Sequence, residues 1–312
     1  MMAMYYPIEL IPEIPRKMAI ETRARDIVIT DTRGVFELRR YLNEEERTIS
    51  RPAKALWERQ SKLVTIDTTK LALDSGRVPS EWEDPWDRMI REFVRDDIIP
   101  EWVKGIAVAG DRIAKKVNLL QRKQFDFDST MTSVKAWVDS EGGNLIVNLT
   151  AAQVGSVHAL LQDQIALGVT SPYILAQRIR PIVGLTEREA LAVARFMGTL
   201  TEEGVAANVI NSQVANYTKF LHKNRASRIA RTELSNSYNF GQIDSMRQAV
   251  TEGWLPGVPE KSWMAGGANP CEICQENEAA GPIALDAAFP SGDEHPTAHP
   301  NCECAVGYRV RR

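Results

Sequence analysis

The stretch ASRIARTELSNSYNFGQIDSMRQAV, residues 226–250, predicts the last long helix of this chain. Ile229, Ala230, Leu234 and Tyr238 recur at the spacing that gives a helix one apolar face. Polar side chains crowd the adjoining faces. Because half-buried polar groups need hydrogen-bond partners, we expect them to form a structural network that links this helix to a cysteine-rich segment further along the chain. The residues of the expected network are Arg231, Thr232, Glu233, Asn236 and Asn239.

The cysteine-rich segment follows this helix and holds all four cysteines of the chain. It contains the spacings C-x-x-C and H-P-N-C-E-C, separated by a loop rich in proline and glycine. Four sulfur ligands at such spacings, with histidine beside them, are typical of a closed tetrahedral zinc site. A loop of this composition cannot build a packed core, so it would gain order from a metal. We therefore predict a structural zinc site within residues 271–304, with the candidate ligands Cys271, Cys274, His299, Cys302 and Cys304.

Two alternatives compete with zinc at this segment. The cysteines could remain reduced without a metal, or they could pair as two disulfides. The sequence shows no secretory signal, and small disulfide folds rarely follow a long helical chain without cysteine, so we expect disulfides least.

Length and composition indicate an ordinary soluble protein. The 312 residues suffice for two domains that each bury a core. The chain is 44% hydrophobic and 25% charged, with a net charge of −3, and no run of eighteen apolar residues predicts a membrane span. Bulk charge therefore gives no sign of a nucleic-acid-binding protein, and we expect no membrane partner.

Local charge is less even, because one basic run contains no acidic residue. A solvated helix face is the default interpretation of such a run, and a contact to DNA phosphates or to an acidic protein surface is the alternative. The run comprises Lys219, Lys223, Arg225, Arg228 and Arg231.

The hydrophobic pattern predicts a mainly helical fold with two regions. Residues 1–145 form a region of long helices, and residues 146–312 form a compact helical domain that ends in a short β and loop element carrying the cysteines. We place the boundary at Asn144–Asn148, a short strand or extended linker flanked by two glycines.

Prolines and helix-capping residues predict where several helices begin or break. We expect the first helix to cover much of Thr32–Asp74 and to be interrupted near Pro52. Other helices should begin at Asp84-Pro85, at Ser171-Pro172, and at capping boxes headed by Thr150 and Thr186.

Several short blocks, in order, resemble the Mu F-type minor head proteins of tailed phages. The similarity covers about residues 145–312 and leaves out the amino-terminal helices. Its blocks are GLTEREA at 184–190, RASRIARTE at 225–233, YNFG at 238–241, Trp263, the C-x-x-C pair and the segment HPNCEC at 299–304. The residues carried over as the domain's signature are Arg231, Glu233, Asn239, Cys271, Cys274, His299, Cys302 and Cys304.

The resemblance implies a structural protein of the phage head that is not an enzyme. Such a protein acts in procapsid assembly, sits in the head interior or at the portal vertex of the virion, and occurs in the host cytoplasm during assembly. Its implied partners are the portal protein, other procapsid proteins and, in some members, packaged double-stranded DNA, with a role in packaging or ejection. The amino-terminal helices would supply an attachment surface for the portal or capsid.

Two other functions compete with this one. Pro270-Cys271-x-x-Cys274 copies half of the nucleobase deaminase signature, in which a nearby glutamate such as Glu233 would be catalytic. The H-x-E half is missing, because His158 and His222 lack the glutamate, and the second cysteine pair would fill the position that a catalytic zinc leaves open. The basic run favours a zinc-containing DNA-binding module instead, whereas the overall charge disfavours it.

Overall fold

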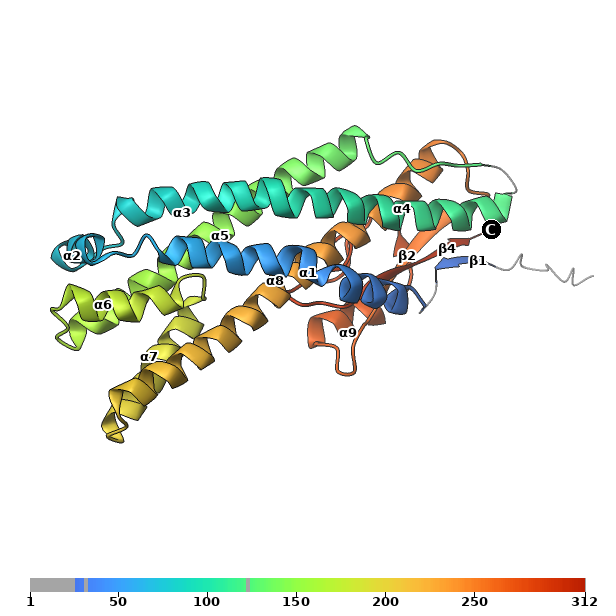
Figure 1. Cartoon of the computed structure of the whole chain (residues 1–312). Helices are drawn as coiled ribbons and strands as arrows, with labels where there is room; N and C mark the ends of the chain where they lie inside the picture. Colours follow the sequence, from blue (N-terminus) through green and yellow to red (C-terminus); the bar gives the residue numbers. More distant parts are fainter. Residues whose placement is uncertain (1–25, 31–32, 122–123, 312) are drawn as a thin grey trace, which may run out of the picture.

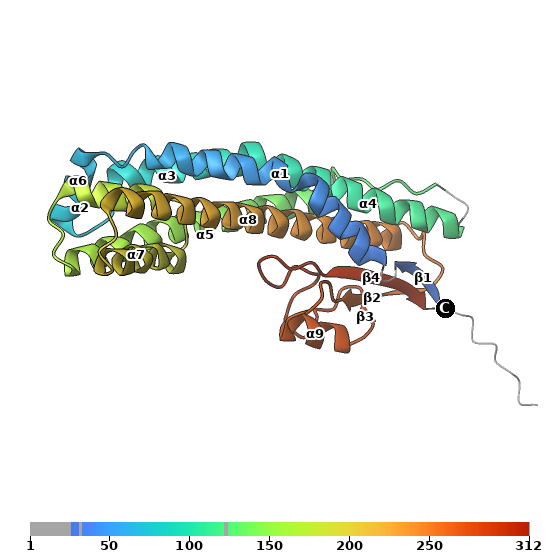
Figure 2. The ribbon, with the colours of Figure 1, turned by 60° about the horizontal axis from the view of Figure 1, so that its bottom comes forward.

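The computed structural model describes residues 26–30, 33–121 and 124–311, and this part of the chain is mainly helical, as predicted. Long helices run side by side to form an elongated body, and a small sheet with the cysteine-rich segment lies against one end of it (Figures 1 and 2). The last described residues of the chain, up to Arg311, lie in that sheet.

The helices are α1 (Arg33–Ser61), α2 (Ile66–Ser75), α3 (Ser80–Phe93), α4 (Ile99–Gln121), α5 (Thr132–Ala166), α6 (Pro172–Ile179), α7 (Glu187–Glu202), α8 (Ala207–Thr251) and α9 (Glu272–Ala279). A π-helical turn joins α3 to α4, and a 3-10 turn follows α6. The strands are β1 (Ile27–Thr30), β2 (Val258–Met264), β3 (Ile283–Ala284) and β4 (Ala305–Arg311), and they form an antiparallel sheet in the order β1-β4-β2-β3.

Helix α8 is the centre of the body and packs most extensively against α4 and α1. A Cβ atom added to Gly241 would lie only 2.4 Å from the carbonyl oxygen of Ile106, so the two backbones approach each other closely here. Tyr238 is fully buried one turn earlier, with its ring centroid 5.1 Å from that of Tyr41. The predicted apolar face of this helix therefore forms part of the main core, although the helix itself begins earlier than expected, at Ala207.

The main core joins the two predicted regions of the chain. Buried side chains from before residue 145, such as Leu38 and Ile106, belong to the same hydrophobic cluster as Leu234 and Tyr308. The sheet likewise combines β1 from the first region with β4 from the second.

The predicted strand or linker at residues 144–148 is wrong. This segment lies in the middle of α5, so the expected capping box at Thr150 falls inside a helix. The glycine pair does not break the helix. Gly142 is buried, and the space beside it would admit a Cβ at ordinary contact distances of 3.7 Å from Ile99 and 4.0 Å from Trp102.

Two further boundaries differ from expectation. Pro52 lies inside α1, and the chain turns only at residues 62–65, where Thr65 caps α2. Pro85 lies inside α3, which begins at Ser80. The predicted first residue of the first helix, Thr32, lies outside the described residues.

A second core fills the far end of the body, where α5, α6, α7 and the beginning of α8 meet. The predicted helix starts are confirmed there: the Ser171 side chain accepts a hydrogen bond from Ile174, and Thr186 with Glu189 forms a complete capping box. Gly184 has a φ of 86° and faces the Trp57 ring so closely that an added Cβ would lie 2.1 Å from it.

Among the described helices, α5 alone has the length and composition that would let it cross a membrane. Its most apolar eighteen-residue stretch has a mean hydropathy of 1.2, and 28% of that stretch is buried in the protein. A single helix of this kind is weak evidence for a membrane protein, because core helices of soluble proteins share its length and composition.

Candidate metal centre

The sheet and α9 bring the two halves of the cysteine-rich segment together. Cys271 is the residue that precedes α9, and Cys274 lies in its first turn. Cys302 and Cys304 stand just before β4, which pairs along its whole length with β2. Because α9 follows β2 by a short loop, its amino end lies beside the start of β4.

Five side chains form two overlapping groups of metal-ligating atoms. Cys271, Cys274 and His299 have ligand atoms within 4.8 Å of one another, and so do Cys274, Cys302 and Cys304. Cys274 belongs to both groups. The cluster could therefore hold a metal ion, and the predicted ligand set is brought together as a whole.

The distances in this cluster match ligands of one tetrahedral ion. The Sγ atoms of Cys274 and Cys302 are 3.8 Å apart, and the Cys274 Sγ is 3.3 Å from the Nε2 of His299. Two sulfurs bound at about 2.3 Å to a tetrahedral zinc lie about 3.8 Å apart, and a sulfur and an imidazole nitrogen about 3.5 Å apart. All four cysteines are free, which does not support the disulfide alternative.

An apolar shell surrounds the inner sulfurs. Cys274, Cys302 and Cys304 are buried and pack with Trp263 and Phe289, whose rings meet edge to face. Cys271 is exposed and His299 is half-buried, so these two lie on the solvent side of the cluster.

Cys304 is placed in a setting that favours a thiolate. A hydrogen bond from Cys302 lowers the pKa of Cys304 to about 6, despite burial, and the backbone N–H of Gly266 also donates to its sulfur at 3.3 Å. Burial raises the pKa of the Cys274 thiol to about 12. Because metals bind thiolates, Cys304 is the sulfur best prepared to receive an ion.

The long loop between the cysteine pairs is held by side chains that sequence reasoning missed. Asn277, fully buried on α9, bonds through both amide atoms to Ser291, at 2.8 and 3.0 Å. Lys261 on β2 is also buried, and it donates to the carbonyl of Glu294 at 2.7 Å. A buried lysine in a strand carries no sequence signal of its own, so only the fold reveals its role.

Polar residues of α8 contact the cysteine segment directly, as expected. Arg231 pairs with Glu303 at 2.5 Å, and the Thr232 hydroxyl accepts from the backbone N–H of Asn301 at 2.8 Å. Asn239 donates to the carbonyl of Cys304 at 3.2 Å. The predicted link between this helix and the cysteine segment is confirmed, although Glu303, its central acceptor, was not singled out from the sequence.

Glu233 belongs to a different environment on the same helix. Its neighbours are Glu141 on α5 and Trp102 on α4, whereas Arg231, Thr232 and Asn239 provide the contacts to the cysteine segment. Burial, reinforced by the charge of Glu141, raises the pKa of Glu233 to about 8. The predicted signature residues thus divide between two separate networks.

The basic run of α8 is not one solvated face. Arg225 is 5% exposed, and its guanidinium lies 5.8 Å from the centre of the Trp57 ring; burial lowers its pKa to about 10. Arg228 pairs with Glu189 at 2.7 Å. Only Lys219 and Lys223 are exposed members of the run, so the expectation of a solvated face is wrong for Arg225.

Comparisons of this chain with protein-family models, with curated proteins and with solved structures give no match.

Proposed function

We propose that this chain is a minor structural protein of a tailed-phage head, of the Mu F type, in which a zinc ion holds the cysteine segment together and polar side chains of the helical body hold that segment in place. The observation that carries the proposal is the Arg231–Glu303 pair. It joins two of the sequence blocks on which the resemblance rests: Arg231 belongs to the block at 225–233, and Glu303 lies between Cys302 and Cys304 in the block at 299–304. Blocks far apart in the sequence thus form one physical unit.

The ligand chemistry favours zinc over other metals. Sulfur and imidazole ligands in tetrahedral order select zinc in proteins, and the sulfur and nitrogen distances given above fit such an ion. Three buried cysteines offer three ligands, and either Cys271 or His299 supplies the fourth. A site with four protein ligands leaves no position for a reactive water, so the ion's role is structural.

The proposed role needs a stiff body with separate contact surfaces. The long helices supply that body, with the sheet and cysteine segment at one end (Figure 2). In this proposal the helices formed by the first half of the chain contact the portal protein or another procapsid protein. The domain of residues 146–312 faces the head interior, and its exposed Lys219 and Lys223 on α8 remain the candidates for contact with DNA phosphates.

The experiment that tests this function is detection of the chain in particles. The full chain, tagged, is co-expressed with portal protein and recovered by affinity capture, and purified procapsids and virions are examined by quantitative mass spectrometry. We expect co-purification with the portal and a few copies per particle. Failure to bind the portal together with absence from both particles would reject the proposal, whether or not the protein contains zinc.

A further inference from the structure

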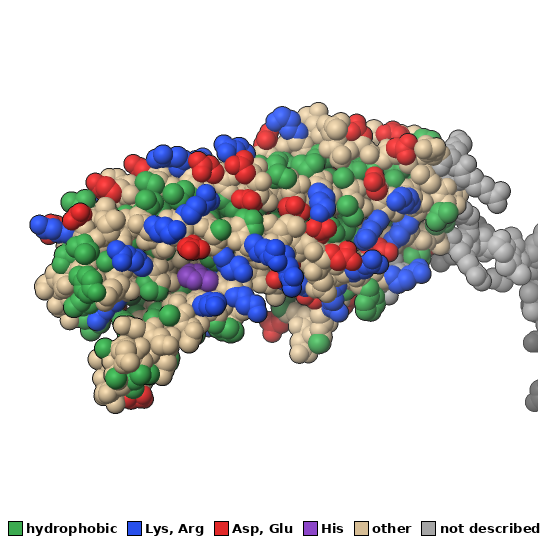
Figure 3. Space-filling model, viewed as in Figure 1, with side chains coloured by type: hydrophobic (Ala, Val, Ile, Leu, Met, Phe, Trp, Pro, Cys, Tyr) green, Lys and Arg blue, Asp and Glu red, His purple; other side chains and the backbone are tan. Residues whose placement is uncertain are grey.

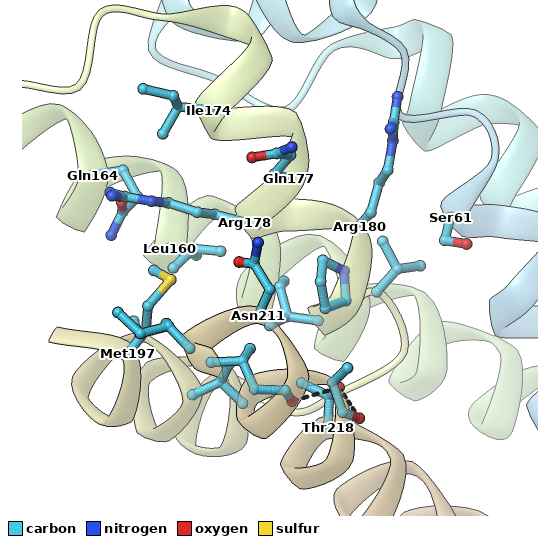
Figure 4. Close-up of a pocket in the computed structure, with 18 of the residues that line it drawn as sticks. Ser61, Leu160, Gln164, Ile174, Gln177, Arg178, Arg180, Met197, Asn211 and Thr218 are labelled. Atoms are coloured by element: carbon cyan, nitrogen blue, oxygen red, sulfur yellow. Dashed lines mark hydrogen bonds between the residues drawn. The ribbon is translucent and has the colours of Figure 1, made fainter. Parts of the chain in front are cut away.

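A large groove lies at the end of the body opposite the sheet. It has a volume of about 1220 Å³ and runs between α6, the α7–α8 hairpin and the end of α1 (Figure 4). Its floor is apolar and consists of side chains from four helices. These floor residues are Leu160, Ile174, Val193, Met197, Ile210 and Val214.

The size of the groove favours a macromolecular occupant. Pockets that enclose small molecules have volumes of about 300–1,000 Å³. This groove exceeds that range and is walled by helices on both sides, an arrangement suited to receiving a further helix along its length.

The charged residues around the groove are unbalanced. The guanidinium of Arg178 donates to the amide oxygen of Gln164, and that of Arg180 donates to the carbonyl of Val64 at 2.6 Å, so both bond to neutral acceptors. Lys54 and Lys219 are exposed at the same groove, and within the described residues none of these four cations forms an ion pair.

Two carboxylates, Glu58 and Glu202, also line the groove, and neither pairs with a cation of the described chain. The lining of the groove thus carries four cations against two anions. A third carboxylate, Asp163, does not line the groove but interacts electrostatically with Arg178, so the positive charge still exceeds the negative. Figure 3 shows Lys and Arg side chains interspersed with hydrophobic ones over this end of the molecule. An apolar floor with an excess of positive charge at its sides calls for an occupant with an apolar face and flanking acids.

We propose that this groove binds an amphipathic helix of a partner protein, with an apolar face that covers the floor and acidic residues that pair with Arg178, Arg180 and Lys219. The site is independent of the cysteine segment, which lies at the other end of the body. The groove is therefore a second binding surface, and the proposal does not depend on whether the cysteine segment binds a metal or a partner.

The test uses two synthetic peptides of about fourteen residues, enough for four helical turns. Both carry leucine at the i, i+3, i+4 and i+7 spacing; one has glutamate and the other lysine at the flanking positions. Fluorescence anisotropy with the full chain measures their affinities. We expect the acidic peptide to bind at least about tenfold more tightly, with a preference that weakens as salt rises.

Substitutions of residues that line the groove test whether the acidic peptide binds there. Arg178→Gln and Lys219→Gln should each weaken the acidic peptide by about three- to tenfold, because each removes a partner for a carboxylate. Lys223→Gln is the matched control: this residue is exposed one turn further along α8 and does not line the groove. Met197→Glu, which places a carboxylate on the half-buried floor, should abolish binding while circular dichroism shows an unchanged fold.

Equal affinity for the two peptides, an absence of saturable binding, or equal effects of Lys219→Gln and Lys223→Gln would each overturn the proposal. Dodecanoate supplies the last control. If this small anion binds saturably and Arg178→Gln weakens it while neither peptide binds, the groove is a small-molecule site and the helix proposal is wrong.

Discussion

The carboxylate of Glu303 lies 2.5 Å from the guanidinium of Arg231 and also accepts a hydrogen bond from Arg39 at 3.2 Å. Glu303 stands between two of the candidate metal ligands, while its two partners lie on α8 and α1. The cysteine segment is therefore tied to two helices of the body through one carboxylate.

Replacing Arg231 by glutamine should loosen this attachment. The side chain is only 13% exposed, and its loss leaves Glu303 with one cation and Glu46 with none among the described residues. We expect a loss of about 1–3 kcal/mol in the free energy of unfolding, together with faster proteolysis within residues 265–304. Arg40→Gln, which removes an exposed pair with Glu44, is the control and should change neither measurement.

The metal ligands should differ in importance. Cys274 belongs to both ligand groups, so elemental analysis should find zinc in the wild-type protein and none in Cys274→Ser. Cys271→Ser and His299→Ala should each keep part of it, because either residue can complete the site, and the double variant should lose it. If the purified wild-type protein contains no metal, and a chelator does not change its melting temperature, the zinc assignment is wrong.

Burial of Glu233 predicts a specific pH dependence. Its pKa is raised from an ordinary 4.5 to about 8, so the folded state holds a proton that the unfolded state releases. Stability from this group is complete at low pH and falls as the pH rises from about 4.5 to about 8. Glu233→Gln removes the ionisation, so the variant should gain on the order of 1–3 kcal/mol over wild type at pH 8.5.

Urea unfolding at several pH values measures this gain. Titrating groups that do not interact with Glu233, including the cysteines, are common to both proteins and cancel in the difference, whereas Glu141 contributes to it because its charge acts on Glu233. The difference should shrink towards pH 5; one that stays constant from pH 5 to pH 8.5 would contradict the assignment of a raised pKa to Glu233.

Local sequence rules predicted the helix starts that depend on a few neighbouring residues. Thr186 and Glu189 cap α7 because their side chains bond to each other's backbone, an interaction contained within four residues. The mainly helical fold class was predicted for the same reason, since it rests on repeated short-range spacing.

Features that depend on distant packing were not predictable in the same way. Gly142 and Gly143 were interpreted as a break, yet α5 continues through both of them and Gly142 is buried in the packed body. We predicted that Arg225 would lie on the surface, because the sequence does not reveal that Trp57 lies beside it. The five candidate metal ligands were predictable from their chemistry and spacing, whereas Glu303 and Lys261 required the fold.

Close packing of α4 on α8 gives a sharp test of the core. An added methyl group at Gly241 would overlap the backbone of Ile106, so Gly241→Ala should destabilise the protein by about 1–3 kcal/mol. Gly143 on α5 is the matched helical control, with nothing within 4 Å of an added Cβ. Gly143→Ala should stabilise the protein by up to about 1 kcal/mol, through helix propensity alone.

Thermal unfolding of both variants compares these effects directly. Equal melting temperatures for Gly241→Ala and wild type would show that α4 and α8 are not in backbone contact in solution.

Helix α8 passes without interruption from the groove to the cysteine segment. At a rise of 1.5 Å per residue its 45 residues extend about 68 Å, and Val214 in the groove lies about 38 Å along the helix from Asn239 at the cysteine segment. Whatever binds at each end is thereby kept at a set spacing. One continuous helix therefore sets the distance between the groove and the cysteine segment.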